Sequence, residues 1–195
     1  MHRFAALAPI CVLAMLAAGC ASPPARFYTL GATARPAATI SNLSVAVGPV
    51  SVPAVVDRPE IVVSAGANQV ALDEFNRWAS PLQNNLARAV AANLVALLGT
   101  QSVTLFPESV SAEAEYRAAI EVQRFESAPG EAATLDAVWT VRRTADGQSR
   151  TGRTTVREPL REKGYAALAA GHSRALARLS QAIAAAIRDL DGARR

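Results

Sequence analysis

Two stretches of alternating sequence decide the fold: YRAAIEVQ at residues 116–123 and LDAVWTVR at residues 135–142. In each, apolar residues occupy every second position, the pattern of a strand with one face on a core and the other in solvent. Pro129-Gly130 lies between them, and Asp146-Gly147 precedes a third extended stretch at 150–157. Both dipeptides favour tight turns. The sequence therefore predicts an antiparallel meander.

Two segments outside the meander carry apolar residues at helical spacing, residues 82–97 and 164–190. Ser80-Pro81 is typical of a helix start, with the serine as cap, and Gly99 is typical of a helix end. Two amphipathic helices packed on one face of a mainly antiparallel sheet make a single α+β domain.

Shorter elements are predicted on both sides of the first helix. Before it, we expect a strand at 26–30, a surface loop at 31–41, a half-buried strand at 43–48, an edge or bulged element at 50–56, and a hairpin joining 61–63 to 70–72. After it, we expect a strand at 102–106.

The first nineteen residues resemble a secretory signal. A positive start is followed by an apolar run at 4–18, which is too short to span a bilayer. Ala17-Ala18-Gly19-Cys20 resembles the lipobox of bacterial lipoproteins, although Ala17 stands where that motif usually has leucine. The alternative is a plain secreted protein with an unpaired thiol.

The lipobox resemblance implies a diacylglycerol and an N-acyl chain on Cys20, and no other cofactor is expected. It divides the chain into a signal peptide at 1–19, a lipidated N-terminus and tether at 20–25, and a domain at 26–195. Cys11 leaves with the signal, so no internal disulfide can form. Ala21 is not the aspartate that favours inner-membrane retention in such lipoproteins, which implies a lipid-anchored protein of the outer membrane facing the periplasm.

Composition argues against several classes of function. The net charge of +4 falls to +3 once Arg3 leaves with the signal, which is too little for a nucleic-acid-binding surface. His172 is the one histidine left after cleavage, and on the apolar side of its helix we expect it to be a packing residue. Metal-ligand spacing, phosphate-binding loops and nucleophile motifs are missing. We expect no metal site and no enzymatic activity.

Three motifs carry a family resemblance: FYTL at 27–30, GPVSVPAVVDRPEIV at 48–62 and NRWASPL at 76–82. In order and spacing they resemble the PqiC-like (YmbA-like) family, the auxiliary lipoproteins of ABC-type intermembrane lipid transport systems. The resemblance implies work with an MCE-domain substrate-binding protein and its ABC permease and ATPase.

Candidate binding residues come from these motifs and from the meander. Asp57, Arg58, Arg77 and Trp78 are candidates for partner docking, although Trp78 could fill the core and the prolines near Asp57 could simply protect a sheet edge. A second candidate is a patch for anionic headgroups or an acidic partner, with a solvated strand face as the alternative. Its residues are Arg142, Arg143, Arg150, Arg153 and Arg157.

Two functions follow as hypotheses. The first is an accessory subunit that docks or stabilises a lipid-transport conduit at the outer membrane. The second is a free-standing structural or assembly lipoprotein of the envelope. Carriage of lipid by the domain itself is less favoured because a compact core of this size leaves little room. Homo-oligomers are compatible with either function.

Overall fold

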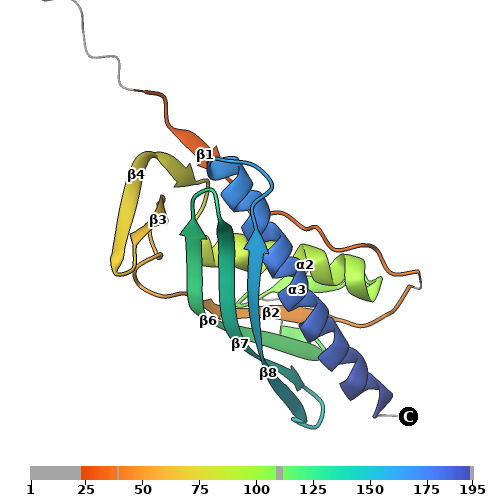
Figure 1. The fold of residues 1–195 in the computed structure, drawn as a ribbon. Helices are drawn as coiled ribbons and strands as arrows, with labels where there is room; N and C mark the ends of the chain where they lie inside the picture. Colours follow the sequence, from red (N-terminus) through yellow and green to blue (C-terminus); the bar gives the residue numbers. More distant parts are fainter. Residues whose placement is uncertain (1–22, 39, 109–111, 194–195) are drawn as a thin grey trace, which may run out of the picture.

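The computed structural model describes residues 23–38, 40–108 and 112–193. Its elements in chain order are β1 (Arg26–Tyr28), β2 (Val45–Ser51), β3 (Glu60–Gly66), β4 (Gln69–Trp78), α2 (Leu82–Leu98), β5 (Val103–Leu105), β6 (Tyr116–Ala128), β7 (Ala132–Arg143), β8 (Ser149–Pro159) and α3 (Tyr165–Gly192). Together they form one α+β domain (Figure 1).

The main sheet has five strands in the order β5-β2-β6-β7-β8. The predicted meander is confirmed: β6, β7 and β8 are antiparallel neighbours, with Ala118 opposite Val141 and Ile120 opposite Trp139. Residues directly opposite one another share a face of the sheet, and these four side chains are all buried. The alternation in sequence therefore marks the core side of the meander correctly.

β2 is more central than the sequence indicates. Its first half runs parallel to both β5 and β6, so Val45, Ala46 and Val47 are fully buried. The strand predicted at 43–48 and the first part of the edge element predicted at 50–56 form this one strand, which has an irregularity between Val47 and Val50. After the irregularity β2 pairs with β6 alone, so this part of β2 is an edge, as Pro49 indicated.

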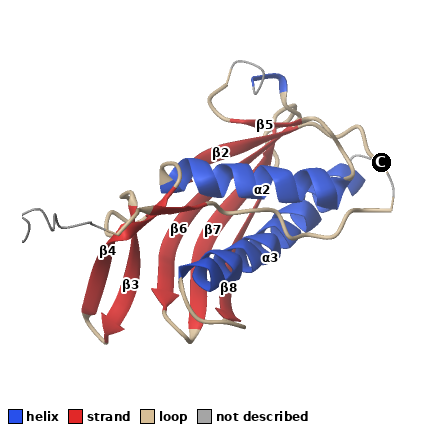
Figure 2. Ribbon diagram, turned by 90° about the horizontal axis from the view of Figure 1, so that it is seen from above, coloured by secondary structure: helices blue, strands red, loops and turns tan. Residues whose placement is uncertain are grey.

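Both helices cover one face of the five-stranded sheet, as predicted (Figure 2). α2 begins at Leu82 with Pro81 at the capping position, so the prediction of Ser80 as cap is wrong: no side chain caps this end. Gly99 ends α2 in the left-handed conformation (φ 65°), as expected. No described helix is both long and apolar enough to cross a membrane.

A second sheet of three strands, β1-β4-β3, replaces part of the single sheet that was expected. The predicted hairpin is present as β3 and β4. β4 is longer than the predicted strand at 70–72 and extends to Trp78. Its pairing with β3 is irregular after Asp73, whose carboxylate accepts hydrogen bonds from the N–H groups of Phe75 and Asn76. β1 then pairs in parallel with this last part of β4.

Candidate functional site

The three segments that carry the family resemblance meet at one place. Phe27 of β1 lies opposite Arg77 of β4, and Arg77 lies opposite Glu60 of β3. The backbone N–H of Trp78 donates to the carbonyl of Pro59 at 2.7 Å. The N–H of Ala79 donates to the carbonyl of Tyr28 at 2.8 Å. We call this place, residues 27–30, 57–60 and 76–82, the motif junction.

Charged side chains of the motif junction pair across its strands. Arg77 forms an ion pair with Glu60 at 2.7 Å. A hydrogen bond from its own backbone, and then the one from Arg77, lower the pKa of Glu60. Asp57 and Arg58 lie exposed in the loop before β3, where Asp57 accepts a hydrogen bond of 3.2 Å from Gln83 at the start of α2. These groups form a mixed-charge surface open to solvent.

Trp78 lies on the inside of the motif junction. Its side chain is 5% exposed and meets the ring of Phe125 edge-on, with 6.1 Å between centroids. Of the four predicted docking residues, Asp57, Arg58 and Arg77 thus share an accessible surface and Trp78 supports it from the core. Phe27 is also accessible, at 63% exposure, and the sequence reasoning did not single it out as a separate candidate.

The five arginines of the predicted anionic patch do not share one face. Arg142 belongs to β7, and Arg153 and Arg157 of β8 lie opposite Val138 and Thr134 of β7. All three arginines are on the face of the sheet away from the helices. Arg150 lies opposite Val141 on the helix side, and Arg143 also points to that side. The pleat of the sheet separates these neighbours in sequence. Binding of anions by the three that remain together stays a prediction.

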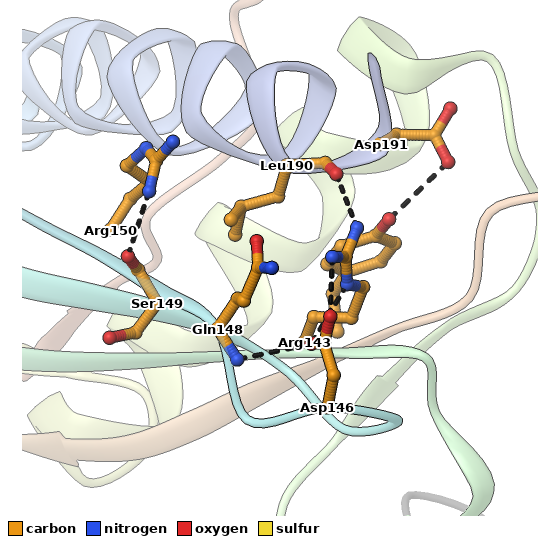
Figure 3. A network of polar contacts seen from close by, with 8 residues as sticks. Arg143, Asp146, Gln148, Ser149, Arg150, Leu190 and Asp191 are labelled. Atoms are coloured by element: carbon orange, nitrogen blue, oxygen red, sulfur yellow. Dashed lines mark hydrogen bonds and ion pairs between the residues drawn. The ribbon is translucent and has the colours of Figure 1, made fainter. Parts of the chain in front are cut away.

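Arg143 is a structural residue, 7% exposed (Figure 3). Its guanidinium donates to both carboxylate oxygens of Asp146, at 3.0 and 2.5 Å, and to the carbonyl of Leu190 at 2.5 Å. The hydrogen bonds from Arg143 lower the pKa of Asp146 to about 2. Beside it, the hydroxyl of Tyr116 donates to Asp191 at 3.3 Å. The network fastens the β7–β8 turn to the end of α3.

Two arginines on the open face of the sheet already have carboxylate partners. Arg153 binds Asp136 through two hydrogen bonds, of 2.8 and 2.5 Å, and these lower the pKa of Asp136. Arg157 lies 3.5 Å from Glu131. Their positive charge is therefore largely compensated within the protein.

His172 is a packing residue, as expected. It is fully buried, and its Nε2 lies 2.9 Å from the hydroxyl of Ser127. Burial lowers its pKa to about 3, so the ring is neutral at physiological pH. The described part of the chain contains no group of histidine, cysteine and carboxylate side chains that could hold a metal ion.

The loop after β1 is fixed by buried polar side chains. Asn93 of α2 accepts the N–H groups of Thr33 and Ala34 at 3.0 and 2.9 Å. Ser173 of α3 accepts the N–H of Gly31 at 3.1 Å. We call residues 31–38 the strap, since they run over the helices in extended form (Figure 2). Sequence reasoning treated them as an ordinary loop; a polar residue on the apolar stripe of α2, as Asn93 is, was the available signal.

Cys20 and the predicted signal peptide at 1–19 lie outside the described residues. The described chain begins three residues after Cys20 and reaches β1 at Arg26. Six residues span about 20 Å at most. If position 20 carries lipid, the start of β1, beside the motif junction, lies within that distance of it.

Comparisons with solved structures find the same fold in other proteins. Two solved structures match nearly their whole length: an uncharacterized protein (TM-score 0.70, 22% identity, covering 85% of this chain and 99% of that one), and XCC0632 of Xanthomonas campestris, assigned to the family model DUF330 (TM-score 0.68, 21% identity, covering 88% and 100%). At these identities they support the fold alone.

A more distant structural match is the PelC dodecamer of Paraburkholderia phytofirmans, with a TM-score of 0.40 and 16% identity, covering 79% of this chain and 93% of that one. No curated protein matches the sequence. The family model described as "ABC-type transport auxiliary lipoprotein component" matches residues 28–184, which is most of the described chain. By its description this is a transport family and not an enzyme family. The chain belongs to the family of ABC-type transport auxiliary lipoprotein components.

Proposed function

We propose that this protein is a non-enzymatic accessory subunit of an MCE-type lipid transport system. Acyl chains on Cys20 anchor it in the outer membrane, and the domain, on the periplasmic side, docks or stabilises the conduit at its outer-membrane end. The observation that carries the proposal is the family match over residues 28–184, together with the three motifs that resemble PqiC-like proteins.

The arrangement of the motifs supports docking at the motif junction. Segments far apart in sequence contribute adjacent groups to it, including the Arg77–Glu60 pair and the exposed Asp57 and Arg58. Aromatic and arginine side chains, such as the exposed Phe27 and the nearby Arg58 and Arg77, are enriched at protein interfaces. The short tether keeps this surface beside the membrane in which the conduit would end.

Site-specific photocrosslinking in intact envelopes tests the docking surface. A photoreactive residue at Arg58 is expected to give a covalent adduct with the MCE protein. The same residue at Thr151, exposed on the far face of the main sheet, is the matched control. Equal adducts from both positions, or none from Arg58 while the transporter is present, would contradict the proposal.

The anchor is tested separately. Intact mass analysis of the native protein is expected to show cleavage before Cys20 and three acyl chains. Cys20→Ser is expected to leave the protein unlipidated and to abolish its recovery with outer-membrane fragments. A bare thiol on a protein that still sediments with the outer membrane would contradict this part of the proposal.

A further inference from the structure

An open cavity of about 870 Å³ lies between α3 and the strap, and none of the predicted docking or anionic-patch residues lines it. The strap borders it on one side, and the end of β8 with the turn that follows borders it on the other. Four arginines line it, Arg35, Arg161, Arg174 and Arg178, together with one carboxylate, Glu158. We call this cavity the arginine groove.

The fold places these arginines from three separate elements. Arg174 and Arg178 are one helical turn apart on α3, so they project from the same face. Arg35 faces them from the strap, whose position is fixed by Asn93 and Ser173. Arg161 follows β8. The groove is thus built by tertiary structure and not by a run of basic sequence.

Charge in the groove is not balanced by the protein. Glu158 forms ion pairs with both Arg174 and Arg178, at 3.2 and 3.9 Å. Within the described residues, Arg35 and Arg161 have no ion pair and both are exposed. The lining therefore carries a net charge of +3. Guanidinium groups gathered on concave walls attract anions and can bind phosphate oxygens in pairs of parallel hydrogen bonds.

The remaining lining indicates a ligand that is partly apolar. Ala34, Leu97, Ala170 and Ala177 contribute small or aliphatic side chains between the arginines. The cavity is also in the size range of sites for organic ligands, about 300–1,000 Å³, far larger than a lone phosphate needs. An amphiphile with a phosphate-bearing head fits both features.

We propose that the arginine groove binds the anionic headgroup of a glycerophospholipid. Arg35 and Arg161 hold the phosphate oxygens, and the glycerol and first methylenes lie along Ala170 and Ala177 of α3. This gives the domain a lipid contact of its own on its surface, which needs no room in the core. It goes beyond the docking role and does not depend on it.

Native mass spectrometry of the lipidated protein in a non-ionic detergent tests the proposal, with dioleoyl-phosphatidylglycerol as the probe. One saturable adduct is expected. The double variant Arg35→Gln/Arg161→Gln should lower its apparent affinity at least tenfold, since both side chains are exposed and unpaired and their loss should leave the fold intact. Arg26→Gln/Arg88→Gln, which removes two exposed arginines outside both the groove and the motif junction, should stay within twofold of wild type.

A gain of binding provides an independent check. Glu158→Gln removes the carboxylate shared by Arg174 and Arg178 and is expected to strengthen the adduct severalfold, a result that misfolding cannot produce. Three outcomes would overturn the proposal: an adduct unaffected by the double variant, equal binding of dioleoylglycerol, which lacks the phosphate, or displacement of the lipid by an equal concentration of inorganic phosphate. Failure of the crosslinking experiment at Arg58 would leave these results unchanged.

Discussion

The imidazole of His172 lies flat on the ring of Phe125, with 3.8 Å between centroids and 11° between planes. One imidazole nitrogen faces Ser127, and the other, Nδ1, is buried without a partner in the structure. A charged ring in this place would be strongly unfavourable because it would be cut off from water. The contact therefore makes stability depend on pH.

We expect the free energy of unfolding to fall as pH drops from about 6.5 towards 5. The folded protein keeps His172 neutral, with a pKa of about 3, while the unfolded chain takes up a proton below the ordinary histidine pKa of 6.5. The loss should approach about 1.4 kcal/mol per pH unit. Urea unfolding at pH 7 and pH 5 measures it. His172→Gln should remove this slope; an unchanged slope would show that other groups cause it.

Gly152 is expected to tolerate no side chain. A methyl group there would lie 2.4 Å from the Trp139 ring, which the Thr154 hydroxyl also holds by a hydrogen bond of 2.9 Å. Gly152→Ala should lower the free energy of unfolding by about 1–3 kcal/mol, the usual cost of overpacking. Gly192→Ala, with nothing within 4 Å of the added atom, is the control and should not destabilise. Equal urea midpoints for both variants would count against this packing.

Asp146→Asn should weaken the junction between the β7–β8 turn and α3. Since the folded-state pKa of Asp146 is lowered from 3.8 to about 2, its contribution is complete above the unfolded-state value and is lost as pH falls between these two values. The melting temperature of the variant should therefore lie below wild type at pH 6, and the difference should shrink by pH 2.5. A gap that stays constant across this range would contradict the ion-pair explanation.

Asn93→Ala should release the strap. The variant leaves the amide groups of Thr33 and Ala34 without their acceptor, at an expected cost of about 1–3 kcal/mol in unfolding free energy. Hydrogen–deuterium exchange should accelerate at these two amides first. Asn84→Ala, at an exposed position of the same helix, serves as the control. Unchanged protection at residues 33 and 34 would show that Asn93 does not hold the strap.

Periodicity predicted those parts of the fold in which each element buries one face. The meander and both helices follow from it because burial of one face imposes a period of two or 3.6 residues. It failed for β2, where Val45, Ala46 and Val47 are all buried, and for the end of β4, where an irregularity at Asp73 interrupts the alternation. Pairing between strands distant in sequence left no local signal.

The candidate sites were predicted less completely, for two physical reasons. Arg142 and Arg143 are adjacent in sequence, and a strand sends adjacent side chains to opposite faces, so a cluster in sequence was not a cluster in space. The arginine groove shows the converse. Arg35 and Arg174 are 139 positions apart in the chain, and they line the same cavity because the strap that carries Arg35 runs beside α3.

The parallel pairing of β1 with β4 has a mechanical consequence. If Cys20 carries lipid as proposed, tension between the membrane and the domain, directed along β1, acts on its paired residues Arg26, Phe27 and Tyr28 together. Shear of this kind must break several hydrogen bonds at once, whereas peeling from one end would break them singly. If β1 detached, the hydrogen bonds of Asn93 and Ser173 to the strap, which follows β1 in the chain, would be the next to bear the load. A domain fastened in this way would bear a pull on its N-terminal end without unravelling at its first strand.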